Sequence, residues 1–182
     1  MDRKPILKRP ILRRWRTLPK SLHVENWNGR GPGGRLEGSC VIASAAMVCN
    51  QQGREDIGNL LKSKFSGGYD PISLKRDLDS LSLPHTSTTS GDTSFLKSVN
   101  RDHLGALISF TTYRMRPNEG HVVYFDRYVK RDGVLTAAIV DNNYPGQEKY
   151  IEYNRFIRIW KQSGGWALTF KMPGGGMVWP QN

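Results

Sequence analysis

The sequence predicts an α+β fold in which helices come first and an antiparallel sheet follows. Between residues 40 and 101, apolar side chains recur at the three- and four-residue spacing of helices that bury one face. From residue 107 onward the pattern changes to short apolar runs separated by turn residues, which is typical of strands joined by hairpins. Because the two kinds of element occupy separate parts of the chain, we expect N-terminal helices packed on a C-terminal antiparallel β-sheet.

Four helices are expected in the first part of the chain, at about 40–52, 55–65, 71–82 and 93–101. A glycine-rich loop without periodicity, at 25–39, leads into the first helix, for which Ser39 is a suitable N-cap. Asp70 followed by Pro71 is a strong signal for the start of the third helix. The Ser/Thr-rich segment 83–92 is expected to be a loop.

The second part of the chain is expected to supply the sheet and one more helix. The predicted strands cover residues 107–112, 121–128, 134–141, 149–152 and 166–170. An amphipathic helix at about 153–161 precedes the last of them and is expected to bury Phe156, Ile157 and Trp160. The segment 129–133 ends in Asp-Gly and is expected to be a hairpin turn.

The positive charge of the chain is concentrated at its N-terminus. The formal net charge is +11, and residues 1–20 contribute +7 of it, with prolines Pro5 and Pro10 that forbid a regular helix. Two interpretations stand: a solvated tail, or an extended anchor that binds nucleic acid or another polyanion. The candidate polyanion-binding residues are Arg3, Lys4, Lys8, Arg9, Arg13, Arg14 and Arg16.

The same reasoning gives a domain organisation and a location. We expect a basic extended arm at 1–24, one domain at 25–172 and an irregular tail at 173–182. No run approaches the roughly 20 apolar residues of a membrane span, and no signal peptide is visible. With two free thiols, the prediction is an intracellular (cytoplasmic) protein or one within a virion or large particle.

The two cysteines are expected to differ in role. Cys40 lies in the first turn of the first helix, where free N–H groups and the helix dipole favour thiolate over thiol. Cys49 is nine residues later, on the opposite face of the same helix, so the two cannot form a disulfide and Cys49 is expected to be structural. We expect no metal site and no cofactor, because the histidines show no ligand spacing. Apart from His121 they are expected at the surface, namely His23, His85 and His103.

His121 is the candidate base for Cys40. It opens the predicted strand 121–128, so its side chain can reach a cleft at the strand end. That strand and the strand 134–141 form a hairpin whose register can be counted. With a loop at 129–133, His121 lies directly opposite Asp141, and directly opposed side chains share one face of a sheet.

Shorter hairpin loops change the residue opposite His121. Loops of four or three residues move that position to Asn142 or Asn143, and only a two-residue loop escapes the pattern by opposing Tyr144. The register therefore leaves three candidates open, with Asp141 favoured by the longer loop.

Three short motifs in this order resemble papain-like cysteine peptidases. They are Gly38-Ser39-Cys40 at the start of an alanine-rich helix, Gly120-His121-Val-Val-Tyr-Phe, and Val140-Asp141-Asn142. The resemblance covers roughly residues 36–171 and is closest to the double-glycine (bacteriocin-processing type) peptidase-like family. It implies a papain-like fold, with Cys40 as nucleophile, His121 as general base and acid, and Asp141 or Asn142 as the orienting residue.

The sequence departs from this family at the oxyanion donor. The family usually has a Gln six residues before the nucleophile, and here that position holds Gly34. Asn28 or Asn26 could supply a side-chain donor, and otherwise the Cys40 backbone N–H remains. Loss of one such donor typically slows an enzyme by roughly a hundredfold or more without abolishing activity.

Two functions are therefore expected from the sequence. The first is a thiol hydrolase that cleaves a peptide bond of a peptide or protein substrate through an acyl-enzyme on Cys40. The second is a catalytically weak or inactive papain-like module that serves as a structural or accessory component of a larger assembly. In that case the basic arm would anchor it to a nucleoprotein or virion.

Overall fold

The computed structural model describes residues 16–17, 24–25, 28–30, 36–65, 68–111 and 120–171. The helices are α1 (Cys40–Gln51), α2 (Glu55–Lys64), α3 (Pro71–Ser80), α4 (Thr93–Arg101) and α5 (Tyr153–Gln162). The strands are β1 (Arg16–Thr17), β2 (Asn28–Arg30), β3 (Leu36–Gly38), β4 (His85–Thr88), β5 (Ala106–Ser109), β6 (Val122–Arg131), β7 (Val134–Val140), β8 (Gln147–Glu152) and β9 (Ala167–Phe170). The predicted α+β class is confirmed.

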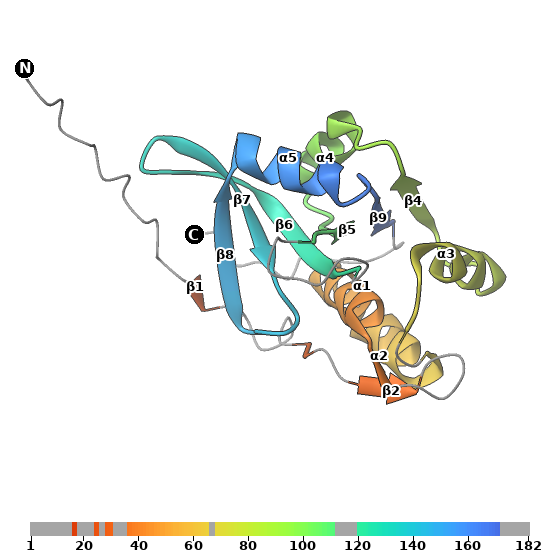
Figure 1. Ribbon diagram of the computed structural model, residues 1–182. Helices are drawn as coiled ribbons and strands as arrows, with labels where there is room; N and C mark the ends of the chain where they lie inside the picture. The colour runs from red at the N-terminus through yellow and green to blue at the C-terminus, as the bar shows by residue number, and fades with distance from the viewer. Residues whose placement is uncertain are drawn as a thin grey trace, which may run out of the picture.

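An antiparallel sheet runs through the middle of the molecule (Figure 1). Its strands follow the order β1-β8-β7-β6-β5-β9-β4, and β2 and β3 form a separate hairpin. The last strand of the described residues, β9, lies between β5 and β4, so the sheet joins segments that are far apart in the sequence. The long hairpin formed by β6 and β7 lies between β8 and β5.

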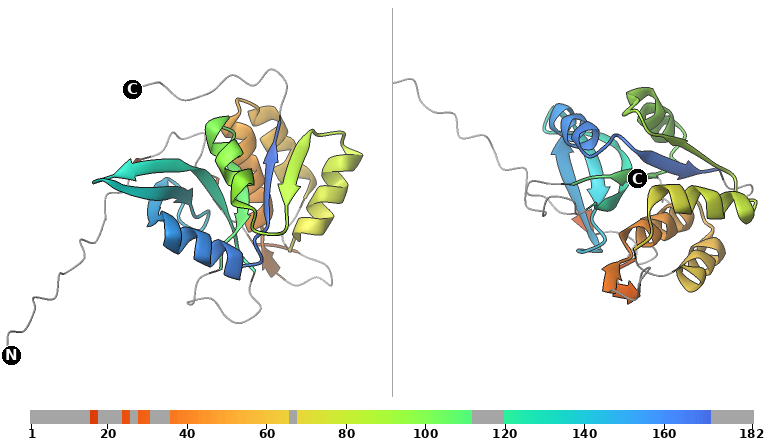
Figure 2. Two further views of the ribbon diagram at one scale, coloured as in Figure 1. Left: turned by 90° about the horizontal axis from the view of Figure 1, so that it is seen from above. Right: turned by 45° about the vertical axis from the view of Figure 1, so that its right-hand side comes forward.

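Helices cover both faces of this sheet. α1, α2 and α3 pack on one face, where their apolar side chains meet Leu107, Tyr124 and Leu168. α4 and α5 pack on the other face against alternate strand residues such as Ile108 and Phe125. Figure 2 shows α4 and α5 on the opposite side of the sheet from α1 and α2. Strand residues alternate between the two faces, so one sheet serves two cores.

The element predictions fail where the strands are polar. β4 lies in the predicted loop 83–92, because its residues His-Thr-Ser-Thr carry no apolar alternation and all four of its backbone partners lie on β9, from Ala167 to Phe170. β2 and β3 lie in the predicted glycine-rich loop 25–39 for the same reason. These strands form because their backbones pair with another strand, β4 with the distant β9 and β2 with β3, and not because their side chains alternate.

Little of the predicted arm and tail falls within the described residues. Arg16 and Thr17 form β1, which pairs with the outer edge of β8, and Val24 is buried in the core that holds α1. The remaining candidate polyanion-binding residues lie outside the described part of the chain, as do residues 173–182. Polyanion binding and the domain boundaries therefore remain predictions.

The helices of the described residues are short. None of them is long and apolar enough to cross a bilayer, since the longest, α1, has 12 residues.

Candidate active site

Cys40 is the first residue of α1, and the helix is held firmly behind it. Every residue from Val41 to Gln51 is buried, whereas Cys40 itself is half-buried. The small side chains of Ala43, Ala45 and Ala46 let α1 approach the central strands closely, and all three are fully buried. The helix N-terminus thus presents one thiol at the surface of an otherwise enclosed helix.

His121 lies directly before β6, beside the N-terminus of α1. Its backbone carbonyl accepts a hydrogen bond from Phe110 N at 2.8 Å, which continues the β5–β6 pairing by one residue. The residue is only 7% exposed, and its Nε2 lies 2.9 Å from Asp141 Oδ1. Because Nε2 is engaged by the carboxylate, Nδ1 is the ring nitrogen left for the hydrogen bond with the Cys40 side chain.

Asp141 follows directly on β7, and three groups hold its carboxylate in place. Oδ1 accepts the His121 contact and a hydrogen bond from the Asn143 backbone N–H at 3.1 Å. Oδ2 accepts a hydrogen bond from Lys149 Nζ at 2.9 Å. The backbone turns sharply here, since Tyr144 N donates to Asp141 O at 2.8 Å. The carboxylate is therefore fixed by the turn on one side and by β8 on the other.

The predicted pairing of His121 with Asp141 is present, but the register that led to it is wrong. The hairpin loop is the two-residue turn Asp132-Gly133, with φ values of 48° and 81° and Arg131 paired with Val134. A β-bulge between Phe125 and Arg127 then shifts the strands by one residue, so that Tyr124 faces Val140. The described pairing stops there.

Asp141 is nevertheless the partner, although the hairpin register alone does not place it opposite His121. The regular pairing of β6 with β7 ends at Tyr124 and Val140. Beyond it, His121 and Asp141 meet through their side chains rather than as directly opposed residues of the two strands. A register counted from the sequence does not include this bulge, because nothing in the sequence marks Asp126 as an extra, unpaired residue.

Asn142 has a different place from the one predicted. It is fully buried and does not take part in the His121 contact. Its Nδ2 lies 3.1 Å from Cys40 O, 2.8 Å from Ser44 Oγ and 2.9 Å from Val122 O. The amide therefore ties the first turn of α1 to the start of β6, which are the segments that carry Cys40 and His121.

The two ionisable partners shift each other's pKa in opposite directions. Burial lowers the pKa of His121, but hydrogen bonds with Asp141 and Cys40, together with their charges, outweigh burial and raise it to about 9 from 6.5. Burial raises the pKa of Asp141, but His121 and Lys149 overcome this and hold it well below its usual range. At neutral pH the pair is therefore an imidazolium beside a carboxylate.

The second cysteine lies in a very different environment. Cys49 is fully buried within α1, and burial raises the pKa of its thiol to about 12. A thiol of this kind is inert at neutral pH. The predicted structural role of Cys49 agrees with this burial.

The candidate oxyanion donors are only partly described. Asn28 lies on β2, and its Cα is opposite that of Gly38 on β3. Since Gly38 is two residues before Cys40, this pairing places the Asn28 position near the segment that carries the nucleophile. Gly34 and Asn26 lie outside the described residues. The role of Asn28 remains a prediction.

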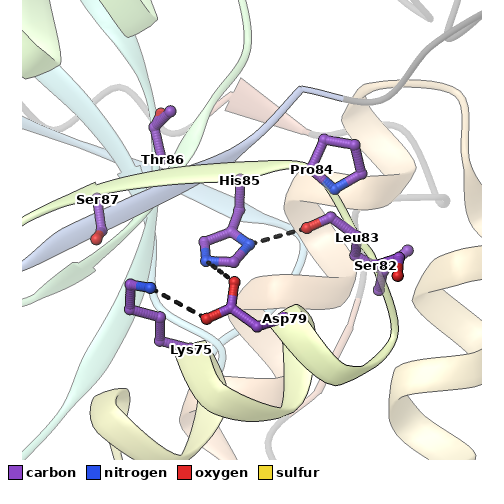
Figure 3. A pocket seen from close by; sticks show the side chains of 8 residues that line it. All are labelled: Lys75, Asp79, Ser82, Leu83, Pro84, His85, Thr86 and Ser87. Atoms are coloured by element: carbon purple, nitrogen blue, oxygen red, sulfur yellow. Dashed lines mark hydrogen bonds and ion pairs between the residues drawn. The ribbon is translucent and has the colours of Figure 1, made fainter.

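A second histidine–aspartate pair lies beside the edge strand β4, in a surface hollow of about 370 Å³ between α3 and β4 (Figure 3). His85 Nε2 is 3.6 Å from Asp79 Oδ1, and Lys75 Nζ is 3.1 Å from Asp79 Oδ2. The expectation that His85 lies at the surface is wrong, since its side chain is only 6% exposed and its Nδ1 donates to Leu83 O at 2.8 Å. Neither cysteine lines this hollow.

Sequence reasoning missed two residues that contact the Cys40–His121–Asp141 site, namely Lys149, which contacts Asp141, and Ser44, which contacts Asn142. Lys149 lies in β8, and its partner across the ladder is Ile139, two residues before Asp141. The signal was one lysine in a short strand, which is also what a solvated strand face looks like. Among the described residues, no group of three His, Cys, Asp or Glu side chains is arranged to hold a metal ion.

Comparison with known proteins gives a match in structure but none in sequence. No protein-family model matches the chain, and no curated protein matches it. A crystal structure described as a "putative C39-like peptidase" from Bacillus anthracis is similar, with a TM-score of 0.55, 14% sequence identity, and coverage of 81% of this chain and 90% of that chain. The chain therefore has the α+β fold of a C39-like peptidase, as the papain-like resemblance predicted.

Proposed function

We propose that this protein is a papain-like cysteine peptidase that cleaves a peptide bond through an acyl-enzyme on Cys40. The observation that carries the proposal is the linked set of contacts from the Cys40 side chain to His121 and from His121 Nε2 to Asp141 Oδ1 at 2.9 Å. A nucleophile, a base and a group that orients the base are the three parts that thiol hydrolysis needs.

Acylation follows from this arrangement. An imidazolium and a helix N-terminus both favour the thiolate form of the adjacent sulfur. Sγ of Cys40 attacks the scissile carbonyl carbon, and the new S–C bond places a negative charge on the carbonyl oxygen. When this intermediate collapses, the C–N bond breaks and the imidazolium of His121 gives its proton to the leaving amine. The product is a thioester on Cys40.

Deacylation returns the proton. Neutral His121 takes a proton from a water molecule as the water oxygen attacks the thioester carbon. The C–S bond then breaks, the carboxylic acid leaves, and Cys40 is again a thiolate beside an imidazolium. Asp141 keeps the ring oriented in both steps and stabilises its charged form.

The oxyanion needs donors at the start of α1. The Cys40 backbone N–H is in the first turn, where N–H groups have no partner within the helix. We propose Asn28 as the second donor, because the β2–β3 pairing brings it opposite Gly38. Replacing Asn28 with Ala is expected to lower kcat by about a hundredfold if this is correct.

A second candidate function has one observation in its favour. Gly34 occupies the position where papain-like peptidases usually carry a donor side chain. A weakly active or inactive module within a larger assembly would tolerate this change. The two functions differ in whether Cys40 forms a covalent adduct that depends on His121.

Labelling with an electrophilic peptide probe tests the proposal. The full chain should form one adduct at Cys40, identified by peptide mass mapping, and the adduct should be lost in Cys40→Ala and in His121→Ala. Cys49→Ala is the matched control and should label normally, because that thiol is buried. Labelling at Cys49, or labelling of Cys40 that does not depend on His121, would reject the peptidase proposal.

A further inference from the structure

The carboxylate that orients His121 carries a second, cationic partner. Asp141 Oδ2 accepts a hydrogen bond from Lys149 Nζ at 2.9 Å, while Oδ1 contacts the imidazole at the same distance of 2.9 Å. The chain of contacts therefore does not end at the carboxylate, as a three-residue site would. It continues to an ammonium group on β8.

Lys149 is held where it is by its strand and by a ring. It lies in β8 opposite Ile139, which brings its side chain to the same end of β7 as Asp141. The side chain is 29% exposed, and Nζ lies 4.9 Å from the centre of the Tyr144 ring. The ammonium is thus bounded by a carboxylate and by an aromatic face, both of which attract a cation.

The acidic neighbour in sequence has a separate cation. Glu148 is fully buried on the other face of β8 and receives a bidentate contact from Arg127, at 2.7 and 3.3 Å. Lys149 is therefore not needed to neutralise Glu148. Among the described residues, the ion pair of Lys149 is the one with Asp141.

We propose that Lys149 is a positioning residue that partly offsets the charge of Asp141, so that this carboxylate orients His121 but holds its ring proton less tightly than a lone carboxylate would. This inference rests on the proposed function and concerns the basicity of its base. A lone carboxylate in contact with an imidazolium would hold the ring proton more tightly. A cation on the second oxygen weakens that hold and makes the proton easier to give to the leaving amine.

The groups that act on the ring are few. Among the residues that the structure describes, Cys40 from α1 and Asp141 from the end of β7 are the charged or titratable groups that act on His121, and His121 and Lys149 are those that act on Asp141. Tyr144 contributes the face of its ring to Lys149. Removing the Lys149 charge therefore changes one identifiable contribution to the ring.

The test is the titration of the His121 ring, followed by NMR in the full-length protein. In Lys149→Met the pKa of His121 should rise by about half a unit or more, because an unshielded carboxylate attracts the ring proton more strongly. Lys149→Gln provides a second neutral variant, and Lys149→Arg, which keeps the cation, should restore the wild-type titration. Lys130→Met, at the exposed far end of the β6–β7 hairpin, removes one positive charge elsewhere and should leave the ring unchanged.

The outcomes separate this inference from the peptidase proposal. A pKa of His121 that stays within about 0.2 units of wild type, or that falls, in both neutral variants would overturn the role given to Lys149. The ring titrates whether or not the protein cleaves peptides, so failure of probe labelling leaves this result intact. Normal labelling with an unmoved titration would reject Lys149 and keep the peptidase.

Discussion

The molecule contains two histidine–aspartate–lysine sets on one sheet, one at the ends of the inner strands β6 and β7 and one at the edge strand β4, and they differ in what surrounds the ring. In the first, His121 is enclosed between α1 and β6, and its ring contacts both Asp141 and Cys40. In the second, the His85 ring donates to a backbone carbonyl, and its carboxylate, Asp79, has a side chain that is 58% exposed. The same three residue types therefore form two different environments.

The contrast shows that a histidine–carboxylate pair is not by itself a catalytic feature. The His121 contact measures 2.9 Å and the His85 contact 3.6 Å, which is beyond hydrogen-bonding range. The larger difference is the third partner, since the His121 ring faces a thiol at a helix N-terminus and the His85 ring faces a peptide carbonyl. Of the two rings, only that of His121 interacts with a thiol.

Replacing each histidine tests this contrast with the largest expected effect. His121→Ala should lower kcat/KM for peptide hydrolysis by about a thousandfold or more, because the general base and acid is lost. His85→Ala should leave kcat/KM within about twofold, because its ring lies in a separate hollow that neither cysteine lines. Steady-state kinetics on a fluorogenic peptide measures both. Equal losses in the two variants would contradict the distinction.

The His121 ring should also link the stability of the fold to pH. The pKa of His121 is raised from 6.5 to about 9 by the fold, so its stabilising contribution is complete below pH 6.5 and is lost as pH rises through 9. The free energy of unfolding should fall by up to about 3 kcal/mol over this range. Denaturant titrations at several pH values measure it. His121→Gln should remove this loss and His85→Gln should retain it, and a loss that persists in His121→Gln would contradict the assignment.

The buried amide behind the first set gives a test of its structural support. Asn142→Ala removes the contacts of Nδ2 with Cys40 O, Ser44 Oγ and Val122 O, so the free energy of unfolding should fall by about 2 kcal/mol. Gln162→Ala, which truncates an exposed amide on α5, should change it by less than about 0.5 kcal/mol. Urea denaturation of both variants makes the comparison. A loss for Asn142→Ala no larger than for Gln162→Ala would show that the amide does not hold α1 to β6.

The carboxylates should show the smallest difference. Asp141→Asn keeps a group that can orient the ring, so kcat/KM at pH 7 should fall by about tenfold rather than a thousandfold. The alkaline limb of its pH profile should move to lower pH, because a carboxylate that raises the pKa of His121 has been removed. Asp79→Asn should change neither. An unmoved alkaline limb in Asp141→Asn would break the proposed link between the carboxylate and the ring.

The sequence predicted elements with strong side-chain patterns and missed those made by pairing alone. Helices with an apolar stripe and the central strands were predicted to within a few residues, because burial of one face imposes a period on the residues. β4 was missed, since a polar edge strand depends on hydrogen bonds to β9, which is about 80 residues later in the chain. The second helical layer was also missed, because helices on either face of a sheet have the same pattern.

The candidate site shows the same division. Cys40 could be predicted from a local signal, the start of a helix, and Asp141 from a resemblance and a register count. The count itself was wrong, since the observed turn has two residues and a bulge at Asp126 shifts the register, and Asp141 reaches His121 through its side chain beyond the end of the ladder. Lys149 could not be predicted, because its contact with Asp141 requires that β8 pairs with β7 and that Lys149 lies opposite Ile139. Neither the pairing nor the register can be read from the sequence.

The rate at which Cys40 reacts with a small alkylating agent, measured as a function of pH, tests the central claim most directly. Cys49 is buried, and a Cys49→Ala background leaves Cys40 as the one reporting thiol. At pH 6 we expect Cys40 to react at least about tenfold faster than in the same protein carrying His121→Ala, because the imidazolium favours the thiolate where a free thiol is protonated. Equal rates at pH 6, with both rising only near the pH at which an ordinary thiol ionises, would contradict the pairing of Cys40 with His121.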